Sequence, residues 1–206
     1  MDATPLVAAE RADLAVLLRT LRDDEWLTPS LCDGWLVRDV VGHLAVNGSA
    51  SPLDVISTAV RNGLSGHRTN SALAARARAW TTDELIDRFL AVRTTGATNR
   101  DPRFALADMV VHHQDIRLPL NRPREIPPDR LLAVLDNPNP GSRPRRRMRG
   151  LRFIASDVDW SAGDGPEVRG TGETIVLAVA GRPVVLDELT GTGVAELRRR
   201  MRPAQP

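Results

Sequence analysis

Residues 107–116 read Ala-Asp-Met-Val-Val-His-His-Gln-Asp-Ile, and this stretch decides the fold. Its apolar residues are spaced like one face of a helix, and it carries two of the chain's four histidines. Asp108 and His112 therefore lie one turn apart on the same helix face, and Asp115 falls on that face too. His113 points roughly a quarter-turn away. A carboxylate and an imidazole at this spacing can both reach one metal ion.

Two ligands do not make a firm metal site, so a third must come from elsewhere in the chain. His43 is the best candidate, because it lies in another helix-like stretch, residues 37–44 (VRDVVGHL). The alternative is that these residues are polar positions on helix surfaces or hydrogen-bonded core histidines. His113 is an alternative to His112 only if the helix is rotated, and its face would then lose Asp108.

Length and composition limit the class of protein. The chain has 206 residues, 42% of them apolar, which is enough to build one domain or two small ones. The net charge is +2, and the chain has many arginines but no lysine. A GC-rich genome produces this composition, so the basic character of the chain is weak evidence for a nucleic-acid partner. Cys32 is the single cysteine, which excludes an internal disulfide. No signal peptide or membrane-spanning run is evident, so we expect a cytoplasmic protein.

The hydrophobic pattern predicts an α+β chain with helices first. We expect helices over 4–21, from 37 to an interruption at 47–52, and over 53–62, 71–80, 81–93, 101–117 and 127–136. Beyond a linker at 137–150, we expect strands over 151–155, 158–160 and 167–169, a buried helix over 173–180 and a basic helix over 193–202. This map gives a helical domain over 1–140 and a small α/β domain over 141–206.

Three groups of segments together resemble a known family. They are SLCDGWLVRDVVGHL (30–44), ADMVVHHQDIRLPL (107–120), and the tail segments GLRFIASDVDW, GPEVRG and ETIVLAVAGRP (within 150–183). In this order and separation they resemble the mycothiol-dependent maleylpyruvate isomerase family, whose members are DinB-like metal-binding four-helix bundles with a C-terminal domain. The resemblance runs from about residue 9 to 200.

The resemblance implies a divalent metal held by His43, Asp108 and His112, with zinc the first choice and nickel or iron as alternatives. It also implies mycothiol, the actinobacterial thiol, as cosubstrate for thiol transfer or cis-trans isomerisation of a small electrophilic substrate. Asp115 would orient a ligating histidine by a hydrogen bond; its alternatives are a salt bridge with Arg117 and a cap of the helix's C-terminal turn. This sequence departs from the isomerase in having Asp108 where that enzyme has Glu. It also has Leu36 where many relatives have Thr.

Other candidates are weighed against simpler interpretations. The candidates for binding the substrate or thiol are Arg38, His67, Arg117 and Arg182. The alternative is that the arginines are solvated surface residues and that His67 is an exposed loop histidine. Cys32, before Asp-Gly-Trp at a helix entry, is more typical of buried packing than of a nucleophile. The basic run at 143–149 is typical of a solvated face rather than of a nucleic-acid site. The alternative function is a catalytically degenerate bundle that acts as a binding or dimerisation module, and a homodimer is compatible with both.

Overall fold

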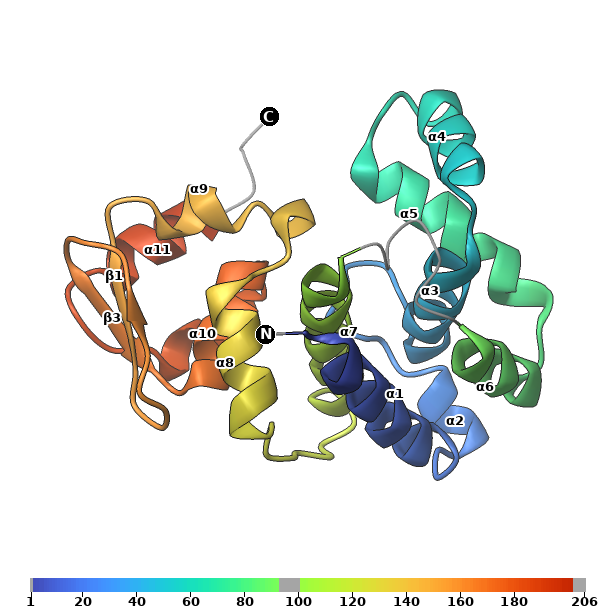
Figure 1. The fold of residues 1–206 in the computed structure, drawn as a ribbon, viewed down its shortest axis with the longest axis horizontal. Coiled ribbons are helices and arrows are strands. Elements are labelled where there is room, and N and C mark those ends of the chain that lie inside the picture. The colour runs from blue at the N-terminus through green and yellow to red at the C-terminus, as the bar shows by residue number, and fades with distance from the viewer. Residues whose placement is uncertain (1, 93–100, 202–206) are drawn as a thin grey trace. The chain divides into compact units, whose positions relative to one another are not determined.

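The computed structural model describes residues 2–92 and 101–201 of the chain. These residues belong to two compact units, Met1–Arg124 and Glu125–Pro206 (Figure 1). The division falls earlier than the boundary expected at residue 140. The reason is that helix α8 (Pro128–Asp136) packs against helix α10 (Gly172–Ala180) and so belongs to the second unit.

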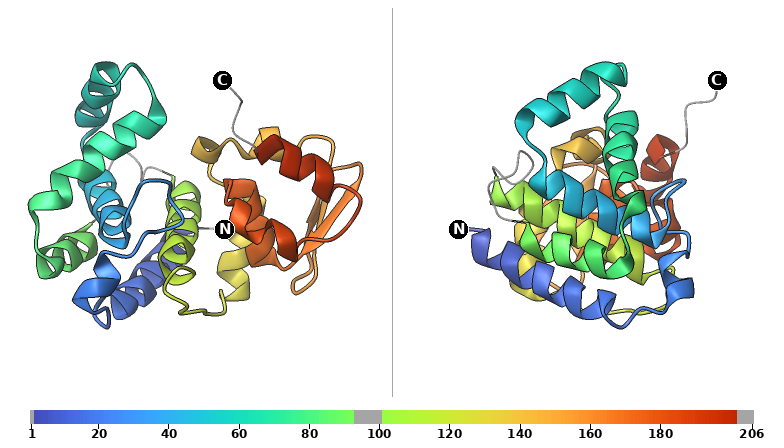
Figure 2. Two further views of the ribbon diagram at one scale, coloured as in Figure 1. Left: turned by 180° about the vertical axis from the view of Figure 1, so that it is seen from behind. Right: turned by 90° about the vertical axis from the view of Figure 1, so that its right-hand side faces the viewer.

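The N-terminal unit is helical and is built around a four-helix bundle. Its elements are α1 (Thr4–Leu18), α2 (Asp23–Trp26), α3 (Val37–Ser49), α4 (Pro52–Arg61), α5 (Gly66–Ala74), the 3₁₀ helix η1 (Ala75–Ala79), α6 (Thr82–Ala91) and α7 (Pro102–Arg117). Helix α1 packs against α7 and α6, and α3 packs against the same two helices, which closes the bundle. Figure 2 shows these helices from two further sides.

The core of the bundle is formed by apolar side chains that recur at helical spacing. The largest of its fully buried side chains are Leu14 and Leu18 of α1, Leu85 and Phe89 of α6, and Leu106 and Ile116 of α7. Burial of each such side chain contributes about 1.5–3 kcal/mol. Gly42 lets α3 approach η1 closely, since a Cβ atom there would lie 2.7 Å from the Cβ of Ala77. The predicted amphipathic helices therefore account for the bundle.

The interruption expected at 47–52 is confirmed. Helix α3 ends at Ser49, Ala50 is extended, and α4 begins at Pro52. Ser51 caps α4 by accepting a hydrogen bond from the Asp54 backbone N–H, with an Oγ–N distance of 3.1 Å. The backbone N–H at the first helical position has no partner within the helix, so proline there removes no helical hydrogen bond and α4 can begin at Pro52.

Two expectations for the N-terminal unit are corrected. The first helix ends at Leu18 rather than residue 21, and a separate short helix, α2, follows. The segment around His67 was expected to be a loop, but it is the first turn of α5. Ser65 caps that helix by accepting from the Arg68 backbone N–H, and α5 packs against α3, so tertiary packing overrides the glycine-rich composition. The expected helix ends at 93 and 202 lie outside the described residues.

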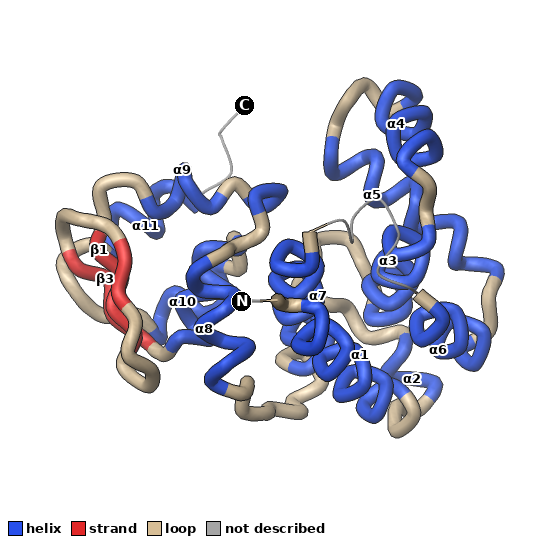
Figure 3. The backbone as a smooth tube through the Cα atoms, viewed as in Figure 1, coloured by secondary structure: helices blue, strands red, loops and turns tan. Residues whose placement is uncertain are grey.

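The C-terminal unit is a small α/β unit. Its sheet has the order β2-β1-β3, formed by β1 (Arg152–Ala155), β2 (Ser161–Ala162) and β3 (Glu167–Gly170), drawn red in Figure 3. Strand β1 is antiparallel to β2 and parallel to β3. Its helices are α8, η3 (Pro140–Ser142), α9 (Pro144–Met148), α10, η4 (Pro183–Glu188) and α11 (Val194–Met201).

Three details of this unit differ from or match the sequence prediction. The strand expected at 158–160 is wrong, because β2 begins at Ser161 and the polar residues before it turn the chain. The basic run forms the short helix α9 rather than a linker. The helix expected at 173–180 is confirmed as α10, and Gly181 follows it with φ of +96°, as a C-cap requires.

The architecture confirms the predicted fold class, a helical bundle followed by a small α/β unit. Among the described residues, no helix is both long enough and apolar enough to cross a bilayer.

Candidate metal centre

Helix α7 supplies most of the site. Asp101 caps the helix by accepting from the Arg103 backbone N–H (3.0 Å), and Pro102 occupies the first helical position. The helix then presents Asp108 and His112 on one face, with Asp108 Oδ1 lying 3.6 Å from His112 Nε2. The opposite ring nitrogen, His112 Nδ1, lies 2.8 Å from Asp115 Oδ2. Helical spacing alone therefore arranges two candidate ligands and the carboxylate behind one of them.

Helix α3 brings His43 to the same place. Its Nε2 lies 3.6 Å from Asp108 Oδ2, and its ring meets the ring of His112 edge-on with centroids 4.9 Å apart. His43 is buried, and the tilted ring of Trp35 lies 5.2 Å from it. The helix is held at its start by Asp39, whose Oδ2 accepts from the Leu36 backbone N–H at 3.1 Å. The side chain of Asp39 thus caps the start of α3.

The three side chains fit a divalent metal ion. Their ligand atoms all lie within 4.8 Å of one another. Zinc bonds of about 2.0–2.2 Å place tetrahedral nitrogen and oxygen ligands about 3.3–3.5 Å apart, close to the 3.6 Å separations found here. The side chain of Asp108 is 30% exposed, so the group has an open side toward solvent. Two imidazoles and one carboxylate with an open position are the donor set of a catalytic rather than a structural zinc site.

The two imidazoles differ in their affinity for protons. Burial lowers the pKa of His43, although its hydrogen bond with Asp108 acts in the opposite direction. Burial also disfavours the charged form of His112. There, however, the charge of Asp108 and the hydrogen bonds with Asp115 and Cys32 prevail and raise its pKa well above the usual value. His43 is therefore ready to act as a neutral ligand, whereas a metal must displace a proton from His112.

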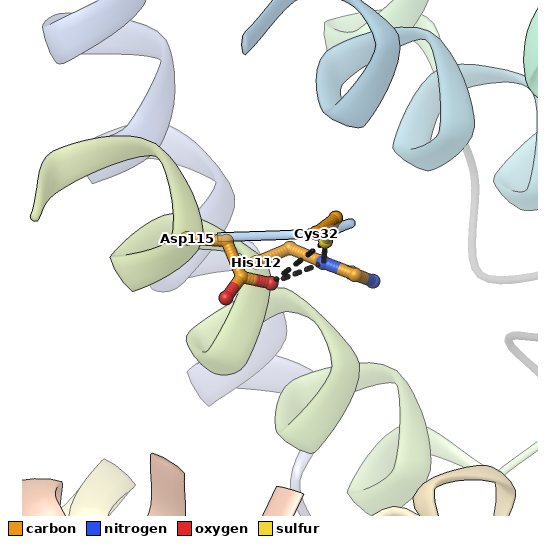
Figure 4. Close-up of side chains that lie close together, drawn as sticks. All are labelled: Cys32, His112 and Asp115. Atoms are coloured by element: carbon orange, nitrogen blue, oxygen red, sulfur yellow. Dashed lines mark hydrogen bonds and ion pairs between the residues drawn. The ribbon is translucent and has the colours of Figure 1, made fainter. Parts of the chain in front are cut away.

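Cys32 lies on the other side of His112 (Figure 4). Its Sγ atom is 3.2 Å from Asp115 Oδ2 and 3.6 Å from His112 Nδ1, and the residue is half-buried. The sequence pattern favoured simple packing for this cysteine. No spacing signal could have found the contact, because 83 residues separate Cys32 from Asp115.

Comparison with known proteins adds to this geometry. Residues 7–94 match the family model described as the mycothiol maleylpyruvate isomerase N-terminal domain. This match lies within the N-terminal unit and covers less than half of the chain. The match includes His43 and ends before Asp108 and His112. No curated protein matches the chain.

Solved structures show the same fold over nearly the whole chain. The crystal structure of the mycothiol-dependent maleylpyruvate isomerase is 14% identical with a TM-score of 0.54, covering 92% of this chain and 91% of that one. A histidine-to-alanine mutant of that isomerase gives 15% identity and a TM-score of 0.55 over the same shares. At this identity the likeness establishes a shared fold.

A second buried network, which the sequence did not reveal, accounts for His113. His113 Nδ1 donates to Glu10 Oε1 of α1 at 2.7 Å, and both side chains are fully buried. Arg117 Nε donates to His113 Nε2 at 2.8 Å, and Arg124 donates to Glu10 through both terminal nitrogens. His113 therefore faces α1 and takes no part in the group formed by His43, Asp108 and His112.

The arginine and histidine candidates lie in different environments. Arg38 donates from Nη2 to the backbone oxygens of Arg78 (3.3 Å) and Trp80 (3.0 Å), which are at the end of η1. Arg117 is engaged by His113 and by the backbone oxygen of Arg122 (3.0 Å). Both arginines thus have hydrogen-bond partners within the N-terminal unit.

The other two candidates, Arg182 and His67, are described only by their local surroundings. Arg182 lies in the C-terminal unit, where its Nη1 donates to the backbone oxygen of Ala180 at 3.2 Å. The backbone of His67 is in α5, and its side chain lies outside what the structure describes.

Proposed function

We propose that this chain is a metal-dependent enzyme that uses mycothiol for thiol transfer or cis-trans isomerisation of a small electrophilic substrate. The observation that carries the proposal is the convergence of His43 from α3 with Asp108 and His112 from α7. The family match and the solved isomerase of the same fold support mycothiol as the thiol and an electrophile as its target.

The ligand set favours zinc, with nickel or iron as alternatives, because imidazole and carboxylate suit all three ions. When bound, such an ion supplies a Lewis acid that stabilises a thiolate at neutral pH. The exposed side of Asp108 marks where a thiol and its electrophile have access from solvent.

Two side chains that contact the ligating histidines orient their rings. Asp115, fully buried, accepts the Nδ1 proton of His112 and so leaves Nε2 free to face His43 and Asp108. Asn47 Nδ2 lies 3.1 Å from His43 Nδ1, and an amide can offer either a donor or an acceptor to that nitrogen. Both imidazoles are therefore held in orientation by a buried side chain.

The test is mycothiol-dependent turnover of maleylpyruvate or another electrophile by the full chain, loaded with zinc. We expect turnover to require both zinc and mycothiol and to be lost in His43→Ala and Asp108→Ala. Asp87→Ala, at an exposed position on α6, is the matched control and should retain it. Turnover that persists in both ligand variants would refute the proposal.

A binding or dimerisation module is the second candidate, and helix α4 favours it. Leu53, Ile56 and Val60 of α4 are 78%, 59% and 63% exposed and share one side of the helix, and Leu64 beyond it is 77% exposed. Such an apolar surface is typical of a protein contact. A chain that stays metal-free after zinc addition, yet is a stable dimer by light scattering, would support this candidate over the enzyme.

A further inference from the structure

The loop that carries Cys32 is fixed in place against α7. Ser30 Oγ accepts from the Cys32 backbone N–H at 3.1 Å, and the Cys32 carbonyl accepts from the Trp35 backbone N–H at 2.9 Å. The Leu31 backbone N–H donates to the Asp115 carbonyl at 3.1 Å, which ties the loop to the helix at the residue that Cys32 faces. The thiol is therefore held beside Asp115 and His112 by the backbone of both segments.

The distances within this group are close to those of a metal-binding face. A tetrahedral ion with bonds of about 2.3 Å to sulfur and about 2.0–2.2 Å to nitrogen and oxygen sets sulfur about 3.5 Å from each of the others. The Sγ atom of Cys32 lies 3.6 Å from His112 Nδ1 and 3.2 Å from Asp115 Oδ2. The nitrogen and the oxygen are closer, at 2.8 Å, which is a hydrogen-bond distance. On metal binding that pair has to open by about 0.5–0.7 Å, and the Sγ–Oδ2 pair by about 0.3 Å.

We propose that Cys32, Asp115 and the Nδ1 atom of His112 form a second metal site, selective for a thiophilic divalent cation such as Zn²⁺ or Cd²⁺. A thiolate, an imidazole nitrogen and a carboxylate are ligands that zinc accepts. Binding is balanced by the release of two protons, one from the Cys32 thiol and one from Nδ1 of the protonated His112 ring, which stays neutral with its remaining proton on Nε2. The cation then replaces these protons beside the buried carboxylate, so no charge is left uncompensated.

The second site does not depend on the proposed function. It uses the Nδ1 face of His112, whereas the group with His43 and Asp108 uses the Nε2 face, and a neutral imidazole serves one of these faces at a time. Loss of either site therefore leaves the other's remaining ligands in place. Variants of Cys32 and of His43 can separate the two experimentally.

Cobalt(II) is the probe for the first experiment, added to the full chain after treatment with a chelator. We expect a thiolate-to-cobalt charge-transfer band that persists in His43→Ala and disappears in Cys32→Ser. Cys32→Ser should keep the weak d–d bands of cobalt at the group with His43, which shows that the variant is folded. Absence of the charge-transfer band in the wild type would overturn the second site.

Thiol reactivity provides an independent measurement, because Cys32 is the only cysteine in the chain. Saturating Cd²⁺ should slow its reaction with a disulfide reagent by about tenfold or more in the wild type and in His43→Ala, since a metal-bound thiolate is no longer a free nucleophile. An unchanged rate would overturn the proposal. If cobalt gives d–d bands at the group with His43 but Cys32 is not protected, only the second site is refuted. If Cys32 is protected but those d–d bands are absent, only the proposed enzymatic metal site is refuted.

Discussion

Replacing Glu10 by glutamine tests the network that fixes α7 against α1. The carboxylate is fully buried and accepts hydrogen bonds from His113 Nδ1 (2.7 Å) and Arg124 Nη1 (3.1 Å). Burial alone would raise the pKa of Glu10, but its bonds with His113 and Arg124 lower that pKa from 4.5 to about 2. The folded state therefore strongly prefers the charged carboxylate.

The size of the effect follows from this difference. At about 1.4 kcal/mol per pKa unit, the fall from 4.5 to about 2 corresponds to about 3 kcal/mol in favour of the charged form. Glutamine keeps the shape but removes the charge, and it leaves the guanidinium of Arg124, which is 10% exposed, without its carboxylate. Breaking a buried pair in this way typically costs about 3–5 kcal/mol. We expect Glu10→Gln to lower the free energy of unfolding by about 3 kcal/mol at pH 7.

Urea unfolding followed by tryptophan fluorescence measures this change. Trp26, Trp35 and Trp80 lie in the N-terminal unit, so a Trp160→Phe background makes the signal specific to that unit. Asp87→Asn, an exposed position on α6, is the control and should shift stability by less than about 0.5 kcal/mol. A Glu10→Gln variant as stable as this control would refute the reasoning.

The pH dependence of the free energy of unfolding tests the same network. Burial lowers the pKa of His113 to about 4, against a usual value of 6.5, so its contribution is present above pH 6.5 and lost as the pH falls toward 4. The contribution of Glu10 is present above pH 4.5 and lost as the pH falls toward 2. The wild type should lose stability across both ranges. Glu10→Gln should lack the loss between pH 4.5 and 2, and an unchanged profile would contradict the assignment.

Three further predictions concern the metal group and its support. Asp115→Asn should weaken zinc binding by about 10- to 100-fold in a competition titration, since it removes the charge that orients His112. Zinc affinity should rise with pH above 6.5, because the raised pKa of His112 makes a proton compete with the metal; a flat profile in the same titration would contradict this. Gly42→Ala should cost about 1–3 kcal/mol in urea unfolding through its clash with Ala77, and adding Ala77→Gly should restore most of it.

The sequence predicted those parts of the site that depend on local geometry. Asp108, His112 and Asp115 are within one helix, so the 3.6-residue period places them on one face before any tertiary contact is known. Glycine and proline similarly marked the break between α3 and α4. His43 could be named only as a candidate from its own helix, because the packing of α3 against α7 is a tertiary event.

The missed features all depend on contacts between distant segments. Glu10 and His113 are 103 residues apart, and neither sits in a pattern that identifies the other. The first part of α5, residues 66–70, was missed because its glycine and asparagine favour a loop, whereas the Ser65 cap and packing against α3 favour a helix. The contact of Cys32 with Asp115 arises because the loop at 30–35 is tied to α7 by its backbone. Local propensity carries no information on such contacts.

Elemental analysis tests the central claim most directly, namely that His43, Asp108 and His112 hold a divalent ion. The protein is purified without chelators or a histidine tag, in a Cys32→Ser background that removes the second group of ligands and leaves this one intact. We predict about one equivalent of zinc, nickel or iron per chain, lost when His43→Ala is added while the circular dichroism of the helices is unchanged. A chain that is metal-free and stays empty after zinc is added, or that keeps its metal without His43, would contradict the account.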